Sequence, residues 1–190
     1  MIKKINWNKL RDMAHETSVN HGFYDNKPSN IHFLCLIVSE LMEAVEADRK
    51  NNRAIINSLE GERYGCFSDK TFHSGNMQFK EIFEEHIKNT LEDELADVVI
   101  RCLDLAGANG IDLPNGYIPT IHNPGNAFTE KVWYISGMLT NPNVTLPCKL
   151  LSTMGYCFQL ASDYSFDLVW HIEKKMMYNS LRAMKHGKRY

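Results

Sequence analysis

Helical periodicity runs through almost the whole chain. Apolar residues recur at steps of three and four, and no segment shows the sustained alternation typical of a strand. The pattern predicts an all-α fold, a helical bundle. Its 190 residues fit one domain, which buries roughly two thirds of its unfolded surface. The predicted helices cover residues 5–19, 30–51, 80–109, 126–140, 147–164 and 167–184.

The breaks between these helices carry turn-forming residues. Residues 21–30 contain Gly, Pro and Asn, and Ser29 or Asn30 is suited to cap the helix that follows. Residues 59–76 have glycines and polar residues without a period, which predicts a surface loop. The proline-rich stretch 114–126 is the best internal boundary, dividing a single domain, 1–190, into halves 1–113 and 126–190.

A weak internal similarity crosses that boundary. DLAGANGIDL, residues 104–113, resembles QLASDYSFDL, residues 159–168, and each closes a long amphipathic helix. Two explanations remain open, a degenerate tandem duplication and helix-end chemistry shared by unrelated helices.

Charge and hydropathy exclude some partners. With 21 Lys and Arg against 23 Asp and Glu, the net charge of −2 gives no overall attraction to nucleic acid or an anionic membrane. No apolar run approaches the roughly 18 residues of a membrane span, and the N-terminus turns polar too soon for a signal peptide. We therefore expect a cytoplasmic protein without a membrane or nucleic-acid partner.

The cysteines predict buried free thiols. Their number is odd, no CxxC is present, and most lie in apolar segments, which disfavours a disulfide or zinc framework. They are Cys35, Cys66, Cys102, Cys148 and Cys157.

Two predicted helices carry carboxylates beside their apolar faces. In IVSELMEAVEADRK, residues 37–50, Glu40 and Glu43 are three residues apart, so they point to nearly the same side of a helix, and Glu46 lies one step further round.

The same spacing recurs in the second of these helices. In LEDELADVVIRCLDLAG, residues 91–107, Glu94 and Asp97 are again three residues apart. Glu92 and Asp93 point away from Glu94, and we expect them to be solvated at the helix start, where acids favour the macrodipole.

Packing the two helices side by side would bring four carboxylates together. Such a cluster repels itself and loses hydration unless cations neutralise it, and hard oxygen ligands suit Mg²⁺ or Mn²⁺. The alternative is a pair of solvated acidic faces, which is what most acid-rich helices are. A di-iron site is disfavoured because the chain contains no Glu-x-x-His.

Three blocks together resemble a known superfamily. They are SELMEAVEADRK at 39–50, TLEDELADVVIRCLDLAGANGIDL at 90–113, and HIEKKMMYNSLRAMKHGKRY at 171–190. In this order they are similar to the MazG-like, all-α nucleoside triphosphate pyrophosphohydrolases, a superfamily that also includes dimeric dUTPases and dCTP pyrophosphatases. The resemblance covers about half of the chain.

The resemblance implies metal ligands, a metal and a mode of assembly. It makes Glu40, Glu43, Glu94 and Asp97 ligands of Mg²⁺, for which Mn²⁺ is an expected substitute. Homo-oligomers, dimers or tetramers, are usual in the superfamily. We expect the helices at 30–51 and 80–109 to pack antiparallel, with the C-terminal helix closing the site.

The closing Lys-x-x-x-Asn-x-x-Arg pattern of the superfamily falls on Lys175, Asn179 and Arg182, which implies contacts to nucleotide and phosphates. Lys88 is a further candidate from before Glu94. The alternative is that these basic residues decorate helix ends, where cations are favoured.

The catalytic carboxylates are expected to be Glu40, Glu43 and Glu46. A metal-bound water is acidic, and Glu46 or Glu43 is the candidate to take its proton.

The expected function is therefore Mg²⁺-dependent hydrolysis of nucleoside or deoxynucleoside triphosphates to monophosphate and pyrophosphate. The alternatives are a non-catalytic nucleotide- or protein-binding module on the same fold, and a phosphoribosyl-ATP pyrophosphohydrolase. The segments 59–76 and 114–166 exceed the superfamily pattern, and selectivity for the base is expected to reside there.

Overall fold

The computed structural model is an all-α bundle, as predicted. It describes residues 5–55, 76–114, 116, 118, 120–122 and 124–184, of which 76–78 are described by their backbone alone. In this part of the chain the extended pairing consists of one isolated bridge between Ile5 and Gly116. The helices are α1 (Trp7–Asn20), α2 (Asn30–Arg49), α3 (Asn76–His86), α4 (Leu91–Ala108), α5 (Phe128–Thr140), α6 (Leu146–Asp163) and α7 (Leu168–Ser180).

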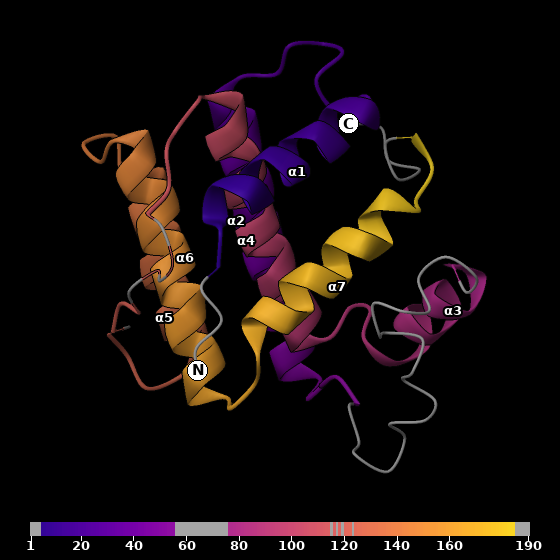
Figure 1. The fold of residues 1–190 in the computed structure, drawn as a ribbon. Coiled ribbons are helices and arrows are strands. Elements are labelled where there is room, and N and C mark those ends of the chain that lie inside the picture. The colour runs from indigo at the N-terminus through magenta and orange to yellow at the C-terminus, as the bar shows by residue number, and fades with distance from the viewer. Residues whose placement is uncertain are drawn as a thin grey trace.

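Helix α4 is the centre of the bundle. Fourteen of its eighteen residues are buried, so it has almost no solvated face. It contacts α1, α2, α6 and α7, and Figure 1 shows α7 crossing it while α5 and α6 pack on the other side of the molecule from α3. Any polar side chain on α4 must therefore find its partner inside the protein.

Helices α2 and α4 are antiparallel, which confirms the expected packing. At one end, Asn30 at the start of α2 exchanges side-chain hydrogen bonds with Asn109, just after α4. At the other end, Asn52, just after α2, donates its side-chain amide to the carbonyl of Asn89, just before α4. This alignment brings the middle of α2 opposite the middle of α4.

The single helix predicted at 80–109 is wrong, because the chain breaks between α3 and α4. Asn89 has a left-handed backbone, with φ +62°. Thr90 then caps α4, its hydroxyl accepting a hydrogen bond from the Asp93 amide. Helix α3 packs through Phe79 and Phe83 in a separate small apolar cluster with α7.

Other expectations are partly met. Ser29 caps α2 through the amide of His32, as predicted. Cys102 and Cys157 are buried free thiols, but Cys35 and Cys148 are exposed, so the prediction of buried thiols is wrong for these two.

Two further predictions concern a loop and a membrane span. The loop predicted at 59–76, with Cys66, lies outside the described residues except for the first residue of α3. In the described part of the chain, every helix is too short or too polar to cross a bilayer.

Candidate metal centre

Three of the four predicted metal ligands converge between α2 and α4. One carboxylate oxygen from each of Glu40, Glu43 and Glu94 lies within 4.8 Å of the other two. Ile37 and Leu41 anchor α2 in the core, and the three-residue step brings Glu40 and Glu43 to the edge of that apolar face. We call these three glutamates the carboxylate cluster.

The cluster is partly withdrawn from water. Glu40 and Glu94 are 3% and 4% exposed, whereas Glu43 is exposed. Burial, followed by the like charges of Asp97 and Asp93, raises the pKa of Glu94 to about 9. Burial and Asp97 also raise the pKa of Glu40, although Arg101 opposes this. Without a cation, the cluster therefore retains a proton near neutral pH.

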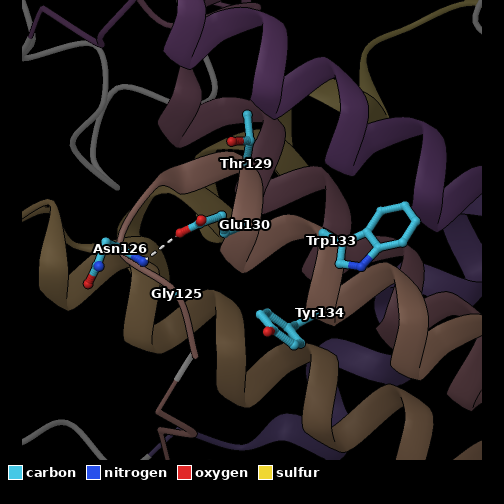
Figure 2. A pocket seen from close by; sticks show the side chains of 6 residues that line it. All are labelled: Gly125, Asn126, Thr129, Glu130, Trp133 and Tyr134. Carbon is cyan, nitrogen blue, oxygen red and sulfur yellow. Dashed lines mark hydrogen bonds between the residues drawn. The ribbon is translucent and has the colours of Figure 1, made fainter.

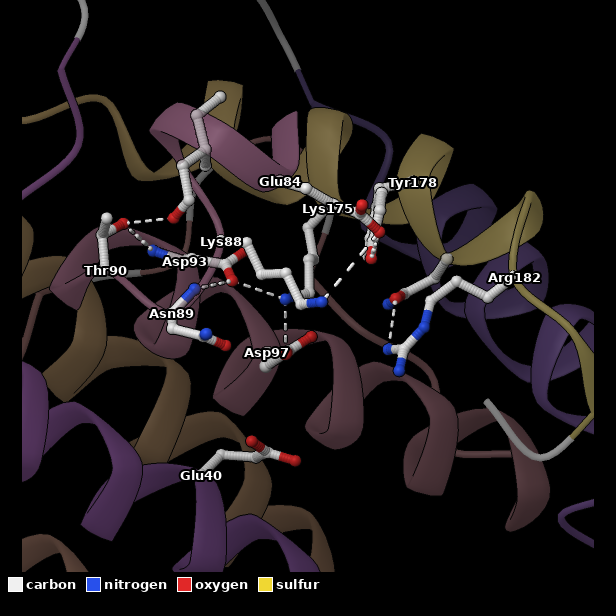
Figure 3. A network of polar contacts seen from close by, with 12 residues as sticks. Glu40, Glu84, Lys88, Asn89, Thr90, Asp93, Asp97, Lys175, Tyr178 and Arg182 are labelled. Atoms are coloured by element: carbon white, nitrogen blue, oxygen red, sulfur yellow. Dashed lines mark hydrogen bonds and ion pairs between the residues drawn. The ribbon is translucent and has the colours of Figure 1, made fainter. Parts of the chain in front are cut away.

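Asp97, the fourth predicted ligand, is engaged by a lysine. Its Oδ2 lies 2.8 Å from Nζ of Lys175, and the same Nζ lies 2.7 Å from Oδ2 of Asp93 (Figure 3). Lys175 is 4% exposed, so α7 inserts a positive charge directly against α4. This ammonium compensates two carboxylates beside the cluster.

Asp93 and Glu92 are buried, which corrects the expectation that they would be solvated. Asp93 is 1% exposed, and its Oδ1 lacks a hydrogen-bond partner among the described residues. Glu92 accepts hydrogen bonds from Nε of Arg53 and the amide of Ala54, at 2.7 and 2.9 Å. The start of α4 is covered because α7 and the chain after α2 both pack over it.

Arg101 also contacts the cluster, although the sequence alone did not predict it. Its Nε donates a hydrogen bond of 2.5 Å to Oε1 of Glu40. The available indication was its position four residues after Asp97, on the same face of the helix.

The predicted substrate contacts divide into two groups. Asn179 and Arg182 line a pocket beside the cluster. Lys175 is instead buried between the carboxylates of Asp93 and Asp97. We call the pocket the α4–α7 pocket. Its polar lining includes Glu40, Asp97, Arg101, Asp104, Asn179 and Arg182.

Lys88 lies away from that pocket. Its Nζ is 4.0 Å from a carboxylate oxygen of Glu84 and 6.0 Å from the centre of the Tyr178 ring. Figure 3 shows the Lys88 side chain reaching toward Glu84. Its predicted role stays a prediction.

Glu46 is exposed to solvent and is not part of the carboxylate cluster. Its two carboxylate oxygens lie 3.1 and 3.0 Å from Arg49 and Lys50. Lys50, and then Arg49, lower the pKa of Glu46, which makes it a weaker proton acceptor.

A second pocket lies on α5 and contains a single carboxylate, that of Glu130. Figure 2 shows Trp133 and Tyr134 projecting from α5 beside Glu130. The Glu130 carboxylate accepts hydrogen bonds from the amides of Asn126 and Ala127, so it serves as a helix cap.

The carboxylate cluster fits a hard divalent cation by its own chemistry. It offers oxygen ligands alone, its charge is undercompensated, and exposed Glu43 leaves a side open to solvent. These properties suit Mg²⁺ or Mn²⁺ better than Zn²⁺, which favours nitrogen and sulfur ligands. Comparisons of the chain with family models, with curated proteins and with solved structures each give no match.

Proposed function

We propose that this protein is a Mg²⁺-dependent pyrophosphohydrolase that converts nucleoside or deoxynucleoside triphosphates to monophosphate and pyrophosphate. The observation that carries the proposal is the convergence of Glu40, Glu43 and Glu94 within 4.8 Å. Glu40 also lines a pocket to which Arg101, Asn179 and Arg182 contribute. The resemblance of the three sequence blocks to MazG-like enzymes supports the same reaction.

Glu40, Glu43 and Glu94 would hold the cation, with Asp97 next to them. A bound Mg²⁺ supplies neutralisation of phosphate charge and acidification of a water molecule. Reactions of this kind depend on positioning and charge compensation more than on covalent chemistry. A rigid, largely buried set of carboxylates on two packed helices meets the positioning requirement.

The other residues have separate roles in the proposal. Asn179 on α7 and Arg182 just after it bind the nucleotide phosphates, because they line the pocket with Glu40 and Asp97. Glu43 accepts the proton of the attacking water, because it is exposed to solvent and belongs to the cluster.

Product analysis is the direct test. Purified protein is incubated with each common NTP and dNTP and Mg²⁺ or Mn²⁺, and pyrophosphate and orthophosphate are measured separately. Pyrophosphate with monophosphate, from one or a few nucleotides, is the expected result. Orthophosphate as the main product, or no product at all, would contradict the proposal.

Site variants connect the reaction to the cluster. Glu43→Gln and Asp97→Asn should each reduce kcat at least about 100-fold, because each removes a charge needed for metal binding or proton transfer. Glu16→Gln, on an exposed position of α1, is the matched control. Retention of activity in Glu46→Gln would favour Glu43 as proton acceptor; loss of activity there would favour Glu46.

A non-catalytic nucleotide-binding module is the second candidate. It is favoured by the ion pairs of Lys175 with Asp97 and of Arg101 with Glu40, which already compensate two of the four predicted ligands. Tight nucleotide binding without product after prolonged incubation with Mg²⁺ and Mn²⁺ would support the non-catalytic binding module.

A further inference from the structure

Arg101 uses only part of its hydrogen-bonding capacity within the fold. Its Nε donates to Glu40, while Nη1 and Nη2 have no acceptor among the described residues. The side chain is 25% exposed. An arginine whose role was only to neutralise Glu40 would be expected to pair its terminal nitrogens with that carboxylate as well.

Arg101 also lines the α4–α7 pocket. Arg101 contributes to its lining from α4, Asn179 from α7 and Arg182 from just after α7. Asp104 also lines this pocket, but its Oδ1 accepts hydrogen bonds from Tyr24 and pairs with His15, at 2.7 and 2.9 Å. That carboxylate already has its own partners.

A planar guanidinium with free terminal N–H groups matches the oxygen spacing of a phosphate. Arginine binds phosphate through two parallel hydrogen bonds, which lysine cannot reproduce. In this position the same side chain also touches Glu40, a member of the carboxylate cluster. Arg101 therefore joins the cluster to the pocket.

We propose that Arg101 is a phosphate-binding residue of this site, donating from Nη1 and Nη2 to the polyphosphate chain while Nε holds the Glu40 carboxylate in place. The inference rests on the proposed function, because it assigns the phosphates to the same site. It adds a phosphate contact from α4 to those proposed for Asn179 on α7 and Arg182 just after α7, which line the same pocket.

The test separates phosphate binding from support of Glu40. Inorganic tripolyphosphate is titrated calorimetrically into the full-length protein at saturating Mn²⁺, and Mn²⁺ binding alone is followed by electron paramagnetic resonance. Arg101→Gln should weaken tripolyphosphate binding 10- to 100-fold, as about 1.5–3 kcal/mol for charged hydrogen bonds implies. Its Mn²⁺ affinity should be unchanged or higher, because a positive charge next to Glu40 is removed. Arg101→Lys should recover part of the tripolyphosphate affinity.

Other outcomes would overturn the inference. The tripolyphosphate affinity of Arg101→Gln could be unchanged, or it could fall as much as the Mn²⁺ affinity. Either result would mean that Arg101 only holds the Glu40 carboxylate in place. Absence of tripolyphosphate binding by the wild type would also count against it. Arg49→Gln, at an exposed arginine of α2, is the control and should bind like the wild type.

The proposed function fails separately. If the wild type binds tripolyphosphate through Arg101 but releases no pyrophosphate from any nucleotide, the phosphate-binding role of Arg101 is supported and the proposed enzymatic activity is contradicted.

Discussion

Lys175 compensates more buried negative charge than any other single residue described near the cluster, since its Nζ lies within 2.8 Å of both Asp93 and Asp97. Lys175→Met should therefore destabilise the metal-free protein by about 3–5 kcal/mol, because Asp93 would remain buried without a counter-charge. Urea denaturation measures this loss. The double variant Lys175→Met with Asp93→Asn should recover most of it, and a loss below about 1 kcal/mol in the single variant would contradict the electrostatic account.

At the scale of residues, spacing alone was enough to predict part of the site. The three-residue step placed Glu40 and Glu43 together and facing Glu94, as the structure shows. Sequence could not predict the burial of Asp93 or the bond from Arg101 to Glu40. Both depend on which residues of α7 and α2 come opposite α4, and that register is fixed by tertiary packing.

At the scale of elements, the break between α3 and α4 depends on Asn89. Its φ of +62° is costly for most residues, but asparagine and glycine tolerate it. Asn89→Gly should leave the free energy of unfolding within about 0.5 kcal/mol of the wild type, whereas Asn89→Ala should lose about 1 kcal/mol. Both retain the amide that donates to Asp93, so urea denaturation of the pair isolates the backbone effect. Equal stabilities would show that the left-handed conformation is not needed.

The same break explains why one long helix was predicted. Phe83, Ile87, Leu91 and Leu95 follow each other at steps of four and are all buried, so the apolar period continues across the turn. The local indication was Thr90 with Asp93 three residues later, the pattern of a helix start. Periodicity reports which residues face the core, but it does not report whether the backbone between them is interrupted.

At the scale of the whole molecule, assembly stays a prediction from the resemblance. We expect a homodimer or homotetramer, and light scattering of the full-length protein measures the mass directly. A monomer at all accessible concentrations would contradict this expectation. It would favour the hypothesis that the second half of the chain, 126–190, replaces a partner subunit.

Stability of the metal-free protein should depend on pH because of the buried cluster. The pKa of Glu94 is raised to about 9 from 4.5, so the folded state keeps a proton that the unfolded chain releases. Its stabilising contribution is complete below pH 4.5 and is lost as pH rises toward 9. Burial lowers the pKa of His171 to about 4, but that residue affects stability only below about pH 6.5. From pH 7 to 9, Glu94 should therefore lower the free energy of unfolding by about 2 kcal/mol, or roughly 4–8 °C in Tm.

A divalent cation should reverse this trend, because it replaces the proton as the counter-charge of the cluster. A free cation concentration of about 100 times the Kd stabilises the folded state by about 2.7 kcal/mol. This stabilisation should grow from pH 7 to 9, because protons compete less for the carboxylates as the pH rises. Thermal unfolding at pH 7, 8 and 9, with Mn²⁺ or with a chelator, gives both curves. In Glu94→Gln the slope of the metal-free curve should flatten and the effect of Mn²⁺ should shrink, since the variant has neither the titrating proton nor the ligand. Wild-type curves that stay parallel with and without Mn²⁺ would mean that the cation binds elsewhere, and the three converging glutamates would then be a buried structural cluster that is stabilised by protonation.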